Sequence, residues 1–320
     1  AEATEDPHAR TRVAAWRSGL LAIGFVLAGS LAPWLVGAGG GGEKGYAQMG
    51  ILVGLIAFAG MAGAVVGTGG IPAHRPIAHP PRNMLAPFSN KAFTWLWLGF
   101  IVQMVSVSIC TAMLPFYDKY WLGNKESTIP SIFAGMALLT VVTTWCWTLL
   151  SRRIGKHRAF IVATVLYAAA TASLWLIMYG NVGLAFAIIL FGIANAGQQL
   201  FCFAIVPDII ALQRARTGIA EEGAFTGLWI WGEKVGLAIG AGLSGLVLQL
   251  VGFQQGAGVQ VLEQSETALY GILLMATLLP ALVCLLSIPA LLCSAKAMSG
   301  LGGRDHLSNK AQQSPGLSSG

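Results

Sequence analysis

Charged side chains are scarce in this sequence. Asp, Glu, Lys and Arg make up 10% of the 320 residues, whereas hydrophobic residues make up 55% and the mean hydropathy is +0.69. A soluble domain carries about 25% charged residues. The deficit excludes a soluble globular protein and predicts an all-α polytopic membrane protein. The basic pI of about 9.2 then reflects membrane orientation, and no nucleic-acid partner is expected.

Motifs for catalysis, metal binding and secretion are also missing. The five cysteines lie in or beside apolar runs without a CxxC pair, which indicates buried, reduced thiols. No HExxH, His/Asp or Ser/Lys pattern occurs at helical spacing, so we expect neither an enzyme nor a resident cofactor or metal. The polar start, beginning at Ala1, holds no signal peptide, and the missing initiator Met predicts a fragment or a processed chain.

Long apolar runs are what the sequence does contain. About 20 helical residues cross the ~30 Å hydrocarbon core of a bilayer. Eight runs of roughly this length predict eight transmembrane helices, with the last two long enough to tilt or to extend past the bilayer. They are Ser18–Val36, Met49–Gly67, Phe93–Pro115, Ile132–Leu150, Phe160–Tyr179, Leu184–Val206, Ala224–Val251 and Ala268–Cys293.

The basic residues predict the orientation of these helices. With the N-terminus inside, 15 of the 19 Lys and Arg residues fall on inside segments and three, Lys44, Lys119 and Lys125, fall outside. Cytoplasmic loops are enriched in Lys and Arg. Both termini of this multi-pass protein are therefore expected in the cytoplasm, and its membrane is expected to be the bacterial inner membrane.

Lys234, the remaining basic residue, stands beside Glu233 inside the seventh run. A charge at the bilayer centre costs about 2.5–3.5 kcal/mol on insertion scales, so an intramembrane charge marks a functional site by default. The alternatives are a snorkelling lysine or a structural ion pair. Adjacent residues are rotated by ~100° around a helix, so Glu233 and Lys234 need not pair with each other, and the role of Glu233 stays open.

Other residues of these runs are candidate companions of Lys234. Gly232, Gly236 and Gly240 form a ridge suited to close packing on another helix, which would leave Lys234 facing a cavity. Trp229 and Trp231 could contact a sugar ring or simply pack in the core. Gln199 on the sixth run could line a cavity or link helices.

The region VPDIIALQRARTGIAEEGAFTGLWIWGEKVGLAIG resembles the glycoside–pentoside–hexuronide:cation symporters, the melibiose-permease branch of the major facilitator superfamily. There a Pro-Asp motif, a basic glycine-containing loop and Glu-Gly precede a helix that carries a lysine. DPHARTRVAAWR, VGAGGGGEKGYAQMG and EQSETALYGILLMATLLPAL are similar to further family segments in the same order. Ile210-Ala211 replace the usual Asp-Tyr, which weakens any assignment of a particular sugar.

The resemblance implies a partial major facilitator fold, whose eight helices correspond to family helices five to twelve. The family's first four helices, which carry most of the site for a coupling Na⁺ or H⁺, would be missing. Expected units are a cytoplasmic segment with two helices, a central cytoplasmic loop, a six-helix bundle and a disordered tail. Their ranges are 1–68, 69–91, 92–294 and 295–320.

The resulting functional prediction is a cation-coupled symporter of a sugar or glycoside that works as a monomer by alternating access. Lys234, Gln199, Trp229 and Trp231 would contact the substrate. A second group would form charge pairs that open and close a cytoplasmic gate, and it comprises Pro207, Asp208, Arg214, Arg216 and Glu222. The alternatives are a non-transporting assembly or scaffold protein, a degenerate remnant, and a lipid-type transporter of the same fold.

Overall fold

The computed structural model describes residues 24, 31, 34–68, 84–122, 128–179, 181–218, 222–254 and 264–312. In these residues the regular elements are all helices, which confirms the predicted all-α class. Six helical stretches are long and apolar enough to cross a membrane. The predicted run Ser18–Val36 lies mostly outside the described residues, as does the linker from 69 to 83.

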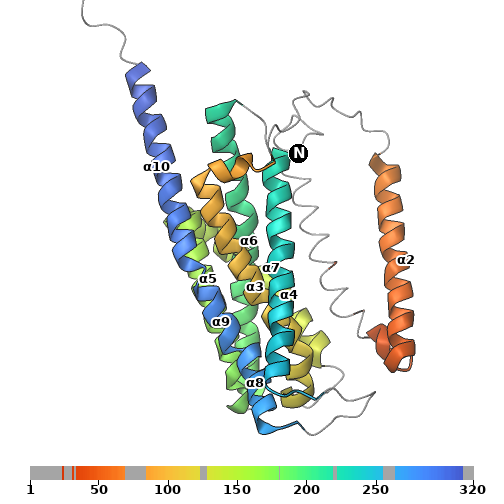
Figure 1. Ribbon diagram of the computed structural model, residues 1–320. Coiled ribbons are helices and arrows are strands. Elements are labelled where there is room, and N and C mark those ends of the chain that lie inside the picture. Colours follow the sequence, from red (N-terminus) through yellow and green to blue (C-terminus); the bar gives the residue numbers. More distant parts are fainter. Residues whose placement is uncertain are drawn as a thin grey trace, which may run out of the picture.

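Helix α3 is the centre of a bundle that contains every described helix except α2 (Figure 1). It packs against α7 on one side and against the C-terminal helices on another, while α5 and α4 cover α6. The bundle helices are α3 Lys91–Tyr117, α4 Thr128–Ile154, α5 Lys156–Ser173, α6 Asn181–Thr217, α7 Glu222–Leu250, α8 Glu266–Ala276, α9 Leu278–Leu285 and α10 Ile288–Gln312.

Short helices join or extend these elements. The 3-10 helix η1, Ala86–Ser89, precedes α3, and the 3-10 helix η3, Leu174–Tyr179, continues α5. Asn90 caps α3, because its side-chain oxygen accepts hydrogen bonds from the backbone N–H groups of Ala92 and Phe93. The π-helix η2, Asp118–Leu122, extends α3 at its other end.

Helix α2, Gly42–Thr68, stands apart from the bundle (Figure 1). Its apolar side chains, among them Phe58, Met61 and Val66, are exposed. Apolar side chains also cover the outside of the bundle, where Trp145, Phe186 and Leu286 are exposed. Such surfaces are stable in lipid rather than in water.

The C-terminal part differs from the sequence prediction in two ways. The predicted single run Ala268–Cys293 is divided into α8, α9 and α10, with Thr277 outside helical geometry at φ −123° and ψ −76°. Pro280 and Pro289 explain the division, because proline lacks the N–H that an uninterrupted helix needs. Helix α10 also continues to Gln312, where the sequence had predicted a disordered tail from residue 295.

Candidate functional site

Helix α7 has one buried face and one exposed face. A Cβ atom added at Gly232 would collide with the Trp97 indole, and one at Gly236 would lie 2.6 Å from Met104 Cβ. The predicted glycine ridge is therefore confirmed as the contact with α3. Lys234 projects from a different side of the helix, as predicted, and 66% of its side chain is exposed.

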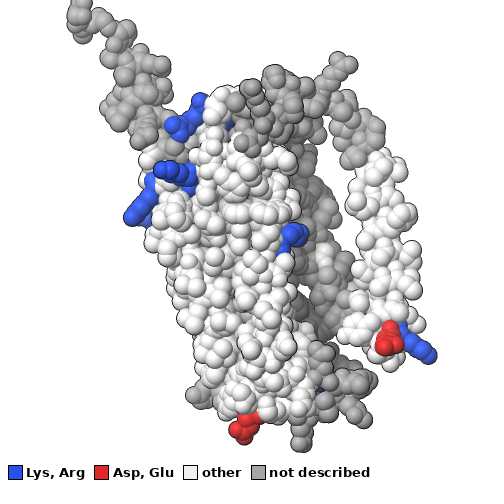
Figure 2. All heavy atoms as spheres, in the orientation of Figure 1, with Lys and Arg blue, Asp and Glu red and all other residues white. Residues whose placement is uncertain are grey.

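Lys234 forms an ion pair with its neighbour. Its Nζ lies 2.8 Å from Glu233 Oε1, and 28% of the Glu233 side chain is exposed. The 100° rotation between adjacent residues had left this pairing open, but both side chains are long enough to bend toward each other. Figure 2 shows an isolated basic patch on the otherwise uncharged flank of the bundle. Lys234 is the single Lys or Arg within α7.

The two predicted tryptophans lie in different environments. Trp231 is 55% exposed and stacks on Trp97, with ring centroids 5.7 Å apart and an interplanar angle of 11°. The indole of Trp97 is itself fixed, because its Nε1 donates a hydrogen bond to the Leu228 carbonyl at 2.8 Å. One turn separates Trp231 from Lys234 on α7. The exposed surface of α7 thus combines an aromatic ring with an ammonium group.

Trp229 belongs to the core instead. Its exposed fraction is 3%, and its ring stacks on Phe100 at a centroid distance of 3.9 Å. Its Nε1 is buried without a hydrogen-bond partner in the described part of the chain. In this conformation Trp229 supports the contact between α3 and α7 and does not reach the surface that holds Lys234.

Gln199 is exposed on α6, whereas the adjacent Gln198 is buried. Gln198 Nε2 donates to Cys284 Sγ at 3.5 Å, which links α6 to α9. Gln103 of α3 lies in the same polar interior, where its Nε2 donates to Thr164 Oγ1 at 3.0 Å and Ser287 Oγ at 3.2 Å. The structure therefore assigns the helix-linking role to Gln198 and leaves Gln199 on the surface.

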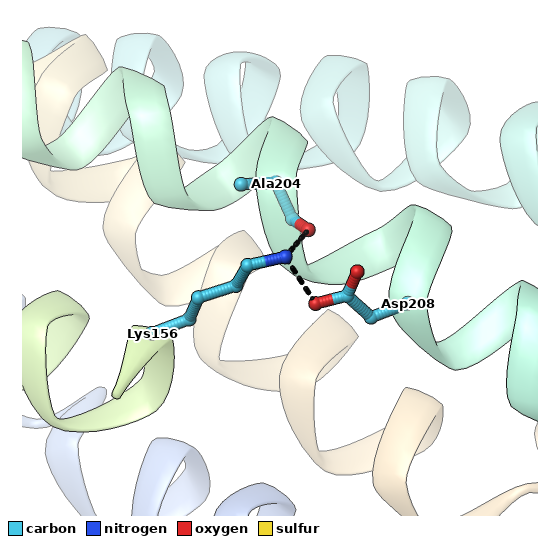
Figure 3. A network of polar contacts seen from close by, with 3 residues as sticks. All are labelled: Lys156, Ala204 and Asp208. Carbon is cyan, nitrogen blue, oxygen red and sulfur yellow. Dashed lines mark hydrogen bonds and ion pairs between the residues drawn. The ribbon is translucent and has the colours of Figure 1, made fainter. Parts of the chain in front are cut away.

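A second group of charged residues gathers at one end of the bundle. Lys156 Nζ of α5 lies 2.5 Å from Asp208 Oδ2 of α6 and donates to the Ala204 carbonyl at 3.5 Å (Figure 3). Gly155, at φ +87°, makes the tight turn that places Lys156 at the start of α5. Arg214 Nη1 lies 3.0 Å from Glu222 Oε1 and joins the end of α6 to the start of α7.

Three of the predicted gate residues, Asp208, Arg214 and Glu222, thus take part in two separate ion pairs. Arg216 is exposed beside them, and Pro207 lies within α6, which continues past it to Thr217. Lys156 was missing from the sequence prediction. The signal for it was its position in the basic turn RRIGKHR, which the predicted orientation places on the same side of the membrane as Asp208.

One further acidic residue lies within a candidate span. Asp118 follows α3 directly, is 6% exposed, and its Oδ1 has no hydrogen-bond partner among the described residues. The predicted third run ended before it, at Pro115. The helical extension η2 carries Asp118 into the span Lys91–Trp121.

The known proteins that match this chain are transport proteins. A family model described as MFS/sugar transport protein matches residues 1–293. An uncharacterised symporter of Synechocystis sp. is 28% identical over 202 residues, which cover 62% of this chain and 37% of that protein. A putative sulfoquinovose importer of Salmonella typhimurium is 24% identical over 286 residues, which cover 84% of this chain and 57% of that protein. The chain thus spans about half or less of the length of these relatives.

Proposed function

The chain belongs to the MFS/sugar transport protein family, and from this premise we propose that it acts as a cation-coupled sugar symporter. The family consists of transporters and not enzymes. The observation that carries the proposal is the exposed face of α7, where Lys234 lies near the middle of a membrane-length apolar helix. An ionisable residue at this depth is costly unless it contacts a polar partner or a cavity.

We propose that the substrate is sugar-like and binds beside α7. A sugar offers apolar ring carbons to an aromatic face and hydroxyl oxygens to a hydrogen-bond donor. Trp231 presents such a face, held in place by Trp97, and Lys234 presents the donor. The name of one relative, a putative sulfoquinovose importer, supports a sugar as substrate. Gln199 would be a further polar contact as the substrate crosses the membrane.

We propose that the two ion pairs at one end of the bundle act as a gate on its cytoplasmic side. The exposed Arg152, Arg153 and Arg158 lie within four residues of Lys156 in the sequence, and such basic clusters face the cytoplasm in inner-membrane proteins. The pairs link α5 to α6 and α6 to α7, so their rupture would let these helices separate. Alternating access would follow from rocking of one bundle against another, with the coupling Na⁺ or H⁺ bound mainly outside this bundle.

Uptake measurements test the proposal. The complete reading frame is expressed in bacterial membranes, and uptake of labelled glycosides is measured with and without Na⁺ and a proton gradient. Lys234→Ala is expected to reduce uptake at least tenfold at equal membrane abundance, whereas Lys91→Ala, an exposed lysine at the start of α3, retains it. Normal uptake by Lys234→Ala would remove Lys234 from the site.

The same experiment tests the competing functions. A lipid-type transporter would move labelled phospholipid and leave all of the glycosides untouched. A scaffold or a degenerate remnant would move neither class of substrate. Either result would refute the sugar proposal.

A further inference from the structure

We propose that the turn between α4 and α5 binds the headgroup of an anionic phospholipid, and that exposed apolar stripes on the adjoining helices hold its acyl chains. The inference goes beyond the proposed function and does not depend on which substrate is transported. It assigns a binding site to three arginines that take no part in the proposed ion pairs, Arg152, Arg153 and Arg158.

The first observation is an excess of positive charge at this turn. Three arginines and Lys156 lie within the seven residues from 152 to 158. Asp208 neutralises Lys156 (Figure 3), and the acid of the neighbouring ion pair, Glu222, is taken by Arg214. The three arginines are exposed, and none of them pairs with an acidic side chain among the described residues. Cations this close together repel one another, so an anion bound among them is favourable.

The turn is tight, which brings the arginines of two helices to one place. Helix α4 ends at Ile154 and α5 begins at Lys156, so Gly155 alone separates them. Gly155 has φ +87°, a conformation that residues with a side chain rarely adopt, and its N–H donates to the Ser151 carbonyl at 2.9 Å. A guanidinium group can bind a phosphate through two parallel hydrogen bonds, so arginines gathered in this way favour a phosphate headgroup.

The second observation is a stripe of exposed apolar residues that continues from Arg158 along α5. Val162, Val165 and Ala169 are exposed, whereas Ala163 and other residues of the opposite side are buried. The exposed residues follow Arg158 at spacings of four, three and four, which places them on one side of the helix. Helix α5 belongs to the candidate membrane span Lys156–Leu176, so this stripe runs from the charged end into the hydrocarbon.

Helix α4 carries a matching stripe that ends at the same turn. Val142, Trp145 and Leu149 are exposed, and Trp145 is 78% exposed. With Arg153 they are spaced by three, four and four residues, so they too share one side of the helix. Two neighbouring helices thus present the same arrangement, a cation at the end and apolar side chains behind it.

Helix α10 adds a further cation next to this pair of helices. Lys296 is exposed, and so is Leu292 one turn before it. Ser294 Oγ donates to the Ala92 carbonyl at 2.8 Å, which holds this part of α10 beside the start of α3. Helix α10 also contacts α5. Figure 2 shows basic side chains gathered toward the upper end of the bundle, above a flank that is nearly uncharged.

The combination of the two observations identifies the ligand as a lipid. A soluble anion would use the cations alone, and a neutral lipid would use the apolar stripes alone. An anionic phospholipid carries a phosphate and two acyl chains, and it is present in the bilayer that these helices cross. Each Lys or Arg beside an anionic headgroup is expected to strengthen binding by about fivefold.

Native mass spectrometry of the complete purified protein in detergent tests the site. The probes are phosphatidylglycerol and phosphatidylcholine with the same acyl chains, because their headgroups differ in net charge. We expect the wild type to bind phosphatidylglycerol about tenfold or more tightly than phosphatidylcholine, and added salt to reduce this preference by screening. Glycerol phosphate, which has the phosphate without the acyl chains, should bind about a hundredfold more weakly than phosphatidylglycerol.

The double variant Arg153→Gln/Arg158→Gln removes two of the cations and is expected to weaken phosphatidylglycerol binding by about 25-fold. Lys44→Gln/Lys119→Gln is the matched control, because it removes the same charge from α2 and η2 and should bind as the wild type does. Arg153→Lys/Arg158→Lys keeps the charge and should lose less binding than the glutamine variant, which separates the proposal from a folding defect.

The unfolding midpoint gives a second readout, because a ligand that binds the folded protein stabilises it. Phosphatidylglycerol should raise the midpoint of the wild type and of the control variant, but not that of Arg153→Gln/Arg158→Gln.

Three results would overturn the proposal. Equal binding of the two lipids by the wild type would exclude a site for anionic lipid. An equal loss of binding in the arginine and lysine double variants would show a diffuse effect of net charge. Glycerol phosphate that binds as tightly as phosphatidylglycerol would indicate a site for a soluble anion. None of these results depends on sugar uptake, so the proposed function is tested separately.

Discussion

Substitution of Gly240 by alanine tests the contact between α7 and α3 most directly. A Cβ at this position would lie 2.5 Å from Ser108 Cβ and 2.6 Å from the Val105 carbonyl oxygen. Carbon atoms at optimal separation lie about 3.5–4.0 Å apart. One of the obstructing atoms belongs to the backbone of α3 and cannot rotate away, so α7 would have to move outward by about 1 Å.

The expected cost follows from three terms. Overpacking of a close contact costs about 1–3 kcal/mol. Outward movement also weakens the hydrogen bond from Ser108 Oγ to the Leu237 carbonyl, now 2.6 Å, and a bond of this kind in a membrane contributes about 1 kcal/mol. Alanine stabilises a helix by about 1 kcal/mol relative to glycine because its helix propensity is higher. The variant is therefore expected to be less stable by about 1–3 kcal/mol.

Thermal unfolding in detergent, followed with a thiol-reactive fluorescent dye, measures the effect. The buried Cys110, Cys202 and Cys284 become reactive when the bundle opens, whereas Cys146 is exposed from the start. The unfolding midpoint should fall by about 2–4 °C for each kcal/mol. Gly242→Ala is the matched control, because a Cβ there meets no atom within 4 Å, and its midpoint should stay or rise. Equal midpoints for the two variants would refute the reasoning.

Two further predictions concern the candidate sites. Trp231→Ala should weaken sugar binding at least tenfold with little change in the unfolding midpoint. Trp229→Ala should instead lower stability by about 3–5 kcal/mol, because its ring is buried against Phe100. A loss of binding in Trp229→Ala together with a loss of stability in Trp231→Ala would show that the two roles are assigned the wrong way round. Asp208→Asn should change stability by less than about 1 kcal/mol, because the pair with Lys156 is half-exposed, yet slow uptake at least tenfold. Partial recovery of uptake in the double variant Lys156→Asp/Asp208→Lys would support a gate, and unchanged uptake in Asp208→Asn would exclude one.

Periodicity and composition were sufficient to predict much of the architecture. The runs of apolar residues predicted the described helices, because hydrophobic length depends on local sequence alone. The spacing of Gly232, Gly236 and Gly240 predicted a packed ridge, which is confirmed, and a Lys234 on another side of α7 that faces a cavity. The structure places Lys234 away from the ridge, with 66% of its side chain exposed. The predicted division of the chain at the linker 69–91 stays a prediction, because most of the linker lies outside the described residues.

The sequence could not show which of two similar residues close together in the chain is buried and which is exposed. Gln198 and Gln199 have the same chemistry, and only the position of α9 determines which of them is buried. Trp229 and Trp231 stack on different rings of α3, Phe100 and Trp97, and only the packing of the two helices shows that Trp229 is the buried one. The break in the C-terminal span depends on Pro280 and Pro289, which many membrane helices accommodate as a simple kink.

The sequence by itself determined that this chain spans a membrane, that Lys234 is an anomaly within an apolar helix, and which face of α7 packs. These properties follow from hydrophobicity and helical periodicity. Only the tertiary structure decided that Lys234 pairs with Glu233 and that Asp208 pairs with Lys156, 52 residues earlier in the chain. Ion pairs depend on side-chain conformation and on helix packing, and neither is encoded in the spacing of residues along one helix.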